Sequence, residues 1–359
     1  MRLRGWRSLP IRCLSACAGV FFVTTILADA QDRGRAGDDR DERLTSYLRT
    51  GKYADARRLI DEMLKTEPRD DLRNVRAVFG SGPNMRVRRA SASFTCEVTD
   101  TGVLLPLTVN GTHANWLIDT GANVSIISDA EAARLGLVLR DSEGRAADHA
   151  GGSTGVRTAT AGHVVIGGTR FEHVPFLVTA ADQMPWKELP AGKQGILGLP
   201  LAIALDALRW TRSGNCHTGA AARRNSPTAG LPNLHYDGLH VVSQVAVDGK
   251  RLEFLLDTGN QAGTQLWERF GKDFAAVVKE HGRKGSTRVT QIGGATDRDI
   301  TLLPPMRLDV GGKETHLREG KLFSKPVGNE RFHGLLGMDV LSQAAEVTID
   351  FRSMRLTLQ

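Results

Sequence analysis

The sequence predicts a mainly β protein with two similarly organised lobes, preceded by a short α-helical hairpin. The tripeptide Asp-Thr-Gly occurs at 119–121 and again at 257–259, each time after an apolar run typical of a buried strand. Turn signals and β-rich runs recur through both halves. Helical periodicity is confined to the region before residue 68 and to the segments 129–135 and 266–281.

The surroundings of the two tripeptides also match. A turn signal precedes each one, at Asn110-Gly111 and at Asp248-Gly249. Two glycine pairs follow in each half, and an apolar segment bounded by glycines closes it, at 195–198 and at 334–337. The landmarks keep their order, which indicates an internal repeat and therefore two lobes of one design.

Asp119 and Asp257 are the candidate catalytic residues. A buried strand that ends in a carboxylate delivers an acid to a loop, and two matching strands bring two acids to one place. Two close carboxylates do not both ionise readily, so one holds a proton while the other is charged. The pair is therefore a candidate acid–base device. Which aspartate plays which role stays open, since such a pair titrates as a unit.

Composition excludes several other classes of function. The chain has 359 residues, 41% hydrophobic and 24% charged, which is ordinary for a globular protein. A net charge of +7, part of it in the first residues, is too mild to predict a nucleic-acid partner. We find no Walker loop, dinucleotide fingerprint, serine elbow or metal-ligand spacing in the sequence, so we expect no cofactor and no metal.

Residues 1–30 fit a signal peptide. A basic start is followed by the apolar stretch 13–28 and by Ala28-Asp29-Ala30, a small-x-small pattern before cleavage. We therefore expect an exported protein, in the periplasm of a bacterium, with no stable membrane span in its mature form. The alternatives are an uncleaved anchor, secretion, or lipid attachment at Cys17.

The remaining chain divides into a helical segment, a linker, a lobe, a second linker and a second lobe. Their bounds are 31–79, 80–97, 98–210, 211–233 and 234–359. The start of the first segment is charged and typical of disorder. Apolar spacing within 41–66 predicts a helical hairpin that resembles one tetratricopeptide-type repeat. One such hairpin cannot bury its apolar face alone, so it packs on the lobes or binds a protein partner.

Two cysteines remain after the predicted signal. Cys96 and Cys216 flank the first lobe, and in an oxidising compartment they form one disulfide. Two buried free thiols are the alternative. In the linker 80–97, Arg86 and its basic neighbours fit either a solvated linker or a prosegment that covers an acidic cleft.

The duplicated Asp-Thr-Gly, each followed by an apolar-apolar-glycine element, resembles the pepsin- and retropepsin-like aspartic peptidases over residues 98–359. The resemblance implies β-barrel lobes related by a pseudo-twofold axis, with a cleft between them for a peptide or protein substrate. It implies that Thr120 and Thr258 bond the two catalytic loops to each other. It also implies that Gly121 and Gly259 leave backbone N–H groups close to the acids.

The resemblance places a glycine-rich hairpin, the flap, at Gly151 and Gly152. Other positions depart from the family: pepsin-like members carry a hydroxyl where Ala122 and Asn260 stand, and retropepsins typically carry aspartate where Asn123 stands. Without those hydroxyls, we expect a pH optimum less acid than that of pepsin. The alternative function is a non-catalytic peptide-binding or scaffold protein on the same fold.

Overall fold

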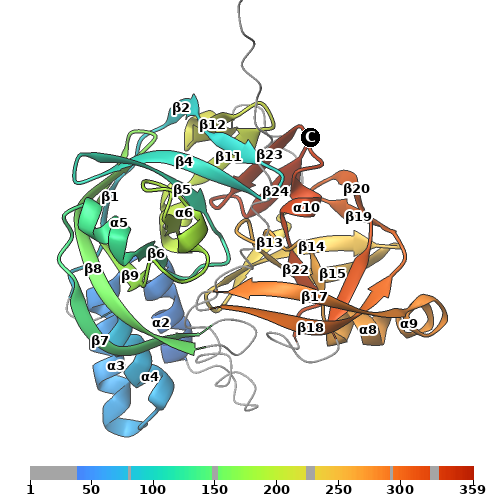
Figure 1. Ribbon diagram of the computed structural model, residues 1–359, viewed down its shortest axis with the longest axis horizontal. Helices are drawn as coiled ribbons and strands as arrows, with labels where there is room; N and C mark the ends of the chain where they lie inside the picture. The colour runs from blue at the N-terminus through green and yellow to red at the C-terminus, as the bar shows by residue number, and fades with distance from the viewer. Residues whose placement is uncertain (1–38, 80–81, 148–152, 224–230, 292–293, 324–330) are drawn as a thin grey trace, which may run out of the picture.

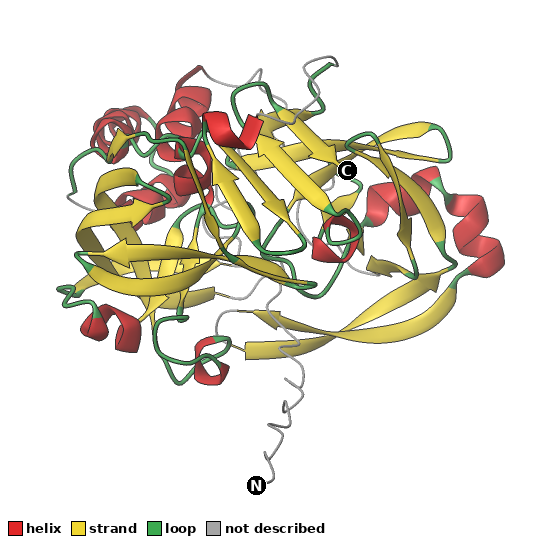
Figure 2. Ribbon diagram, turned by 90° about the horizontal axis from the view of Figure 1, so that it is seen from above, coloured by secondary structure: helices red, strands yellow, loops and turns green. Residues whose placement is uncertain are grey.

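Two strand-rich lobes lie side by side, with a cluster of helices against the first (Figure 1). This computed structural model describes residues 39–79, 82–147, 153–223, 231–291, 294–323 and 331–359. The larger helices gather at opposite ends of the molecule, and strands fill the body between them (Figure 2). The prediction of a mainly β, bilobal fold with helices before it is confirmed. The predicted signal, residues 1–30, lies outside the described residues.

The first lobe is a closed barrel, because its strands pair in the order β9-β6-β10-β5-β4-β8 and β8 then pairs again with β9. Its interior is packed with buried side chains. Among them, the rings of Trp116 and Phe176 lie edge to face with their centres 5.6 Å apart. The strands of this lobe are β3 (Glu97–Thr99), β4 (Gly102–Val109), β5 (Thr112–Ile118), β6 (Ser125–Ser128), β7 (Arg140–Ala147), β8 (Ser153–Ile166), β9 (Thr169–Thr179) and β10 (Gly195–Leu197).

The second lobe repeats the pairing scheme of the first. The parallel pair β5–β10 has its counterpart in β15–β22, and the parallel pair β6–β9 in β16–β21. The antiparallel pair β10–β6 likewise matches β22–β16. The strands of this lobe are β13 (Leu234–Asp237), β14 (His240–Val247), β15 (Lys250–Leu256), β16 (Gln265–Leu266), β17 (Arg283–Gln291), β18 (Gly294–Leu303), β19 (Met306–Val310), β20 (Lys313–Leu317), β21 (Gly320–Phe323) and β22 (Gly334–Leu336).

The two predicted hairpin turns have the left-handed backbone that their sequences favour. Asn110 and Gly111 have φ of 48° and 88°, and Asp248 and Gly249 have φ of 49° and 78°. Positive φ at both central residues matches the twist of a two-residue hairpin. These turns set the register of β4 against β5 and of β14 against β15, and so decide which residue ends each strand.

The segment 39–79, called here the helical unit, holds three helices instead of the predicted two. They are α2 (Asp39–Arg49), α3 (Tyr53–Thr66) and α4 (Asp70–Phe79). Pro68 ends α3 as expected, but the acidic first turn of α4 starts a third helix directly afterwards. The likeness to a tetratricopeptide-type repeat is not confirmed. The apolar residues of 41–66 are buried within the chain, so a protein partner for this segment stays a prediction.

The remaining helices are short and lie at the ends of strands. The helical patterns of 129–135 and 266–281 are confirmed as α5 and as the pair α8 and α9. None of the described helices is long and apolar enough to cross a membrane. The bounds are α5 (Asp129–Arg134), η1 (Trp186–Glu188), α6 (Leu199–Ala204), α7 (Ala220–Arg223), α8 (Glu268–Asp273), α9 (Ala275–His281) and α10 (Met338–Leu341).

The two predicted linkers contain strands. The segment 80–97 holds β1 (Arg86–Arg88), which pairs with β9 at the edge of the first lobe, and β2 (Ala92–Thr95). The segment 211–233 holds β12 (Asn215–Thr218) and α7, and its residues 224–230 lie outside the described residues. The polar composition of both segments had predicted linkers without strands. Backbone groups of an extended segment still need partners, and these segments find them in distant parts of the chain.

Two of these strands, β2 and β12, belong to a third sheet, which has the order β2-β12-β11-β23-β24. It joins β11 (Ala207–Thr211), at the end of the first lobe, to the C-terminal hairpin of β23 (Glu346–Asp350) and β24 (Arg355–Leu358). The chain end that was assigned to the second lobe therefore pairs with the first. We call this sheet the interlobe sheet.

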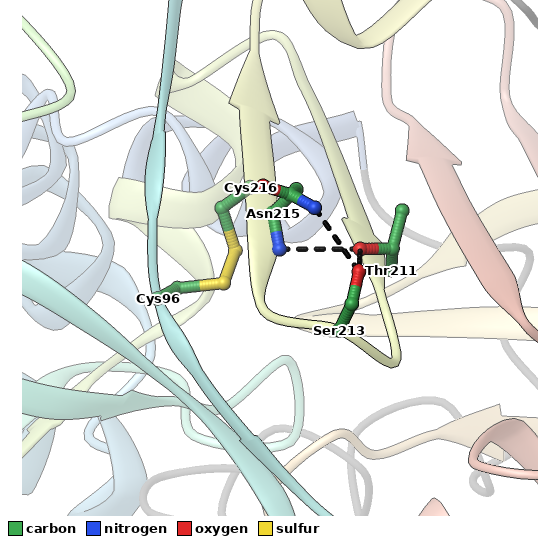
Figure 3. The surroundings of a disulfide bond; sticks show 5 residues. All are labelled: Cys96, Thr211, Ser213, Asn215 and Cys216. Atoms are coloured by element: carbon green, nitrogen blue, oxygen red, sulfur yellow. Dashed lines mark hydrogen bonds between the residues drawn. A yellow bond between two sulfur atoms is a disulfide. The ribbon is translucent and has the colours of Figure 1, made fainter.

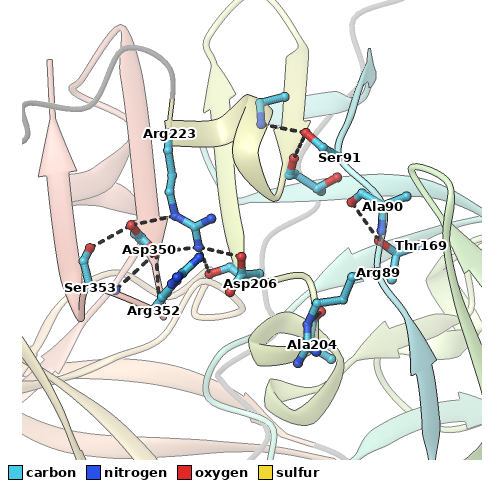
Figure 4. Close-up of polar contacts among 12 residues, drawn as sticks. Arg89, Ala90, Ser91, Thr169, Ala204, Asp206, Arg223, Asp350, Arg352 and Ser353 are labelled. Carbon is cyan, nitrogen blue, oxygen red and sulfur yellow. Dashed lines mark hydrogen bonds and ion pairs between the residues drawn. The ribbon is translucent and has the colours of Figure 1, made fainter.

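A disulfide and an ion-pair cluster reinforce the interlobe sheet. Cys96 and Cys216 are joined at 2.01 Å, so β12 is linked to a segment 120 residues earlier (Figure 3). Arg223 Nε and Nη2 donate to the two carboxylate oxygens of Asp350, each at 3.0 Å. Its Nη2 also lies 2.7 Å from Asp206 Oδ2 (Figure 4). The C-terminal hairpin is thus fastened to the first lobe by backbone and side-chain contacts.

Candidate active site

Each candidate acid stands directly after a buried strand. Asp119 follows β5 and donates its backbone N–H to Leu197 O of β10 at 2.9 Å. Asp257 follows β15 and donates to Leu336 O of β22 at 3.0 Å. The glycine-bounded segments that closed each half of the repeat are therefore the parallel neighbours of the acid-bearing strands, and they hold the start of each catalytic loop.

The two catalytic loops are bonded to each other through their threonines. Thr120 Oγ1 donates to Leu256 O at 2.7 Å, and Thr258 Oγ1 donates to Ile118 O at 2.8 Å. Each hydroxyl also accepts the backbone N–H of the other threonine, at 3.1 Å in both directions. All four groups are buried, so each bond avoids the cost of an unpaired polar group.

The glycines bring each loop against the acid of the other lobe. A Cβ added at Gly121 would lie 2.6 Å from Asp257 Cγ, and a Cβ added at Gly259 would overlap the carboxylate of Asp119. No real side chain tolerates such an approach, so only glycine fits at either position. Asp119 and Asp257 are 1% and 0% exposed. The two carboxylates therefore meet in one buried place between the lobes.

The two carboxylates accept corresponding backbone hydrogen bonds. Asp119 Oδ1 accepts the N–H of Gly121 at 2.7 Å and that of Ala122 at 3.1 Å. Asp257 Oδ1 accepts the N–H of Gly259 at 2.9 Å, and the backbone of Asn260 also bonds this carboxyl. Backbone N–H groups favour the charged form of a carboxyl, so both loops help to stabilise an anion at the site.

The pKa of Asp257 is raised well above its ordinary value. Burial is the largest cause, the negative charge of Asp119 is the second, and a hydrogen bond shared with the carboxyl of Asp119 is the third. That bond requires one of the two carboxyls to be protonated, since two carboxylates are both acceptors. The arrangement therefore holds one proton between two acids.

The residues that depart from the family pattern are also buried at the site. Ala122 and Asn260 are 0% exposed, and Asn123 is buried beside them. The side chain of Asn260 holds its own loop, because Nδ2 donates to Gly263 O at 2.6 Å and Oδ1 accepts the N–H of Ala262 at 3.1 Å. The predicted flap residues Gly151 and Gly152 lie outside the described residues.

Two hydroxyls that sequence reasoning missed support the loops. Ser125 Oγ accepts the N–H of Gly198 at 3.0 Å, and Thr264 Oγ1 accepts the N–H of Gly337 at 3.1 Å. Asp339 in turn accepts the backbone N–H and the hydroxyl of Thr264, at 2.8 and 2.7 Å. A hydroxyl residue shortly after each Asp-Thr-Gly was the available signal, and only the paired geometry gives it a meaning.

A hollow of about 700 Å³, open to solvent, lies mainly on the first lobe. Leu117, two residues before Asp119, and Ile196, on the parallel strand β10, line one side of it. Gln261, from the loop that follows Asp257, lines it as well, whereas neither aspartate does. Leu104 and Trp186 add apolar surface. A largely apolar hollow of this kind fits apolar groups of a ligand.

The described residues offer no cluster of metal-binding side chains. No three histidine, cysteine, aspartate or glutamate side chains in the described ranges gather closely enough to hold a metal ion. His333, a buried histidine of the second lobe, contacts Asp273 and the backbone of Glu253. Asp119 and Asp257 therefore remain the candidates for chemistry.

Comparison with known proteins agrees with this site. Residues 105–201, which include Asp119, match the family described as "Aspartyl protease". Among solved structures, the chain is similar to a retropepsin-like aspartic protease from Rickettsia conorii, with 17% identity over 38% of this chain and 92% of that chain, at a TM-score of 0.26. No protein in the curated collection matches. The resemblance of residues 105–201 to the aspartyl proteases is thus confirmed.

Proposed function

Because the first lobe matches the aspartyl proteases, we propose that this protein is an aspartic endopeptidase whose Asp119 and Asp257 activate a water molecule together. The observation that carries the proposal is the reciprocal approach of each catalytic-loop glycine to the carboxylate of the other lobe. It brings two buried acids from separate strands to one place between the lobes. Such a pair shares a proton and works as an acid and a base.

The two acids work as one unit, and the raised pKa of Asp257 supports one retained proton in the pair. The ionised carboxyl takes a proton from water as the oxygen attacks the scissile carbonyl carbon, and the protonated carboxyl donates its proton to the carbonyl oxygen. The first carboxyl then gives its proton to the amide nitrogen and the C–N bond breaks. The second carboxyl recovers its proton from a hydroxyl of the tetrahedral intermediate, so no covalent enzyme intermediate forms.

The substrate is a peptide or protein segment in extended form. The apolar hollow beside Leu117 and Ile196 accepts one of its side chains. The hairpins β7–β8 and β17–β18 extend from the two lobes toward the boundary between them (Figure 1). We infer that both lobes contribute a hairpin to the substrate site, although the sequence favoured a flap in the first lobe only.

Export from the cytoplasm is part of the proposal. Disulfides persist in oxidising compartments, so the bond between Cys96 and Cys216 supports an exported mature protein, as the basic and apolar start of the chain does. A periplasmic location follows if the source is a bacterium. Mass spectrometry of the protein from its native host, without reducing agent, tests both the cleavage site and the disulfide.

The test of the catalytic proposal is hydrolysis of casein by the purified chain. The matched variants are Asp119→Asn and Asp257→Asn, which keep the shape of each acid and remove its proton chemistry. We expect each to lower the rate by roughly 10³-fold. Equal turnover by all three proteins would remove the pair from the mechanism. Binding of casein fragments without cleavage by the wild-type chain would instead support the peptide-binding alternative.

A further inference from the structure

The helical unit contacts the hairpin β7–β8 at a defect in its ladder. The pairing of β7 with β8 shifts register between Asp141 and Arg145, so the intervening residues leave the ladder. Helix α4 bonds Arg145, where the pairing with β8 resumes on the edge strand: Asn74 Oδ1 accepts the N–H of Arg145 at 2.7 Å, and Asn74 Nδ2 donates to Arg145 O at 3.0 Å. One amide side chain thus bonds both backbone groups of a strand residue.

Two further contacts make this junction specific. Ser142 Oγ donates to Ala77 O, near the end of α4, at 2.9 Å, and accepts the N–H of Gly144 at 3.0 Å. A Cβ at Gly144 would lie 2.7 Å from Val78 Cγ2 and 3.1 Å from its backbone nitrogen. The bulge in β7 is therefore shaped to fit the end of α4.

The other end of the helical unit contacts the second lobe. Arg49, the last residue of α2, donates from its guanidinium to Gly238 O, in the turn between β13 and β14. Its Cζ lies 4.5 Å from the centre of the Tyr236 ring, a cation–π distance. Burial raises the pKa of Tyr236 to about 12, although the positive charge of Arg49 opposes the rise. The guanidinium is thus inserted between the helical unit and the second lobe.

The body between these two ends is a packed core. Leu44, Ile60 and Leu72, one from each helix, are at most 1% exposed, and Tyr53 stacks on Phe79 at 4.9 Å. An ion-pair cluster joins the starts of the outer helices, because Arg69 bonds both Asp41, at 3.0 Å, and Asp71, at 2.6 Å. A displacement at one end of such a body is transmitted to the other, since packed interiors are poorly compressible.

We propose that the helical unit is a brace that fixes the position of the hairpin β7–β8 relative to the second lobe, with Arg49 and Asn74 as its positioning residues. If the hairpin lines the substrate site, as the proposed function requires, the brace sets substrate affinity. The unit is then an internal part of the peptidase. Its buried apolar face serves this role, and no outside partner is needed for it.

Hydrogen–deuterium exchange on the full chain tests the brace without relying on activity. Asn74→Ala should speed exchange of the described strand β7 by about ten-fold, the factor that the net loss of one hydrogen bond gives. The contacts of Arg49 described above are with the second lobe and not with β7, yet Arg49→Ala should speed exchange of β7 as well. Arg73→Ala, which removes only the exposed α4 ion pair with Asp70, is the matched control and should leave β7 unchanged.

Faster exchange confined to 234–240 in Arg49→Ala, with β7 unchanged, would overturn the proposal and leave two independent local contacts. Unchanged exchange of β5 and β15 shows that the lobes are folded. If Arg49→Ala does not fold, Arg49→Lys keeps the charge, loses the planar contact with Tyr236, and carries the same expectation.

In kinetics, both positioning variants should raise KM several-fold with kcat unchanged. The double variant Arg49→Ala, Asn74→Ala should have a KM little higher than that of either single variant. Losing the contact at one end is enough to release the hairpin, so losing the second contact adds little. Full additivity would contradict a connected brace. A chain that cleaves no peptide would refute the proposed function while the exchange result still decides the brace.

Discussion

The two lobes repeat one pairing scheme but complete it differently. In the first lobe, the long strands β8 and β9 form one continuous hairpin that closes the barrel. In the second lobe, Pro304 and Pro305 divide the counterpart of this hairpin, so β18 pairs with β21 and β19 pairs with β20. Proline cannot donate to a ladder, so the ladder of the second lobe is interrupted there. The site scaffold, which needs only the acid strand and its parallel neighbour, is the same in both.

The catalytic loops differ as well. The first loop is short, and Ala122 adds a second backbone donor to Asp119. The second loop is longer by a turn that Asn260 holds, with Gly263 at φ of 88° and Asp339 behind Thr264. Equal motifs thus stand in loops of unequal length. The comparison teaches that the tripeptide places the acid, whereas the residues after it decide how the loop is held.

The largest expected effect comes from the glycines that face the opposite acid. Gly121→Ala and Gly259→Ala each force a carboxylate out of place, and we expect each to lower kcat/KM on casein-derived peptides by about 100-fold or more. Gly259→Ala should be the worse, because its added carbon approaches Asp119 more closely. Gly155→Ala, at a position with open space around it, is the control. Full activity in either catalytic-loop variant would contradict the described approach of the lobes.

The hydrogen bonds of Thr120 and Thr258 should contribute equally to the free energy of unfolding. Thr120→Val and Thr258→Val each leave a buried carbonyl and a buried N–H unpaired, which costs about 2 kcal/mol in the free energy of unfolding. The double variant should cost less than the sum, since the hydroxyls serve one network. Urea unfolding measures all three, with Thr112→Val at the half-buried start of β5 as control. Strict additivity would show that the loops are held independently.

Asp257 at the candidate site and Asp350 in the interlobe sheet should make the free energy of unfolding depend on pH in opposite directions. Because its pKa is raised, Asp257 contributes stability that is full below the ordinary aspartate pKa and is lost as pH rises through the raised one. Asp257→Asn should therefore become progressively more stable than wild type as pH rises toward neutral. Unfolding curves across that range measure it, and a constant difference at all pH values would refute the raised pKa.

Asp350, in the interlobe sheet, is the matched opposite. Burial alone would raise the pKa of Asp350, but hydrogen bonds from Arg223 and Ser353 outweigh it and lower the pKa. Its stabilisation is present above the ordinary aspartate pKa and is lost as pH falls through the lowered one. Asp350→Asn should therefore be less stable than wild type near neutral pH, by about 2 kcal/mol, and equal to it in strong acid.

The smallest expected effect is a shift of the pH profile. Ala122→Ser places a hydroxyl beside Asp119, and a hydrogen bond to the charged form should move the acid limb of kcat/KM down by up to about one pH unit. Asn260→Ser should shift the limb in the same direction but also lose stability, because it breaks the turn to Gly263. An unmodified protein whose rate peaks below about pH 3 would refute the hydrogen-bond argument.

Local patterns in the sequence were enough to predict the acids, the turns that set the register of their strands, and the glycine-bounded segments that became β10 and β22. A strand's alternation, a left-handed turn and a loop glycine are each decided by residues next to one another. That is why the mainly β fold and the residues of the site could be predicted before any contact was known.

Only the tertiary structure decided what the polar segments do. Residues 80–97 and 211–233 have the composition of linkers, and they become strands because the C-terminal hairpin and the disulfide between Cys96 and Cys216 bring distant backbones together. The third helix, the bulge in β7 that receives it, and the raised pKa of Asp257 are of the same kind. Each depends on burial and on partners far along the chain, which residue order alone does not specify.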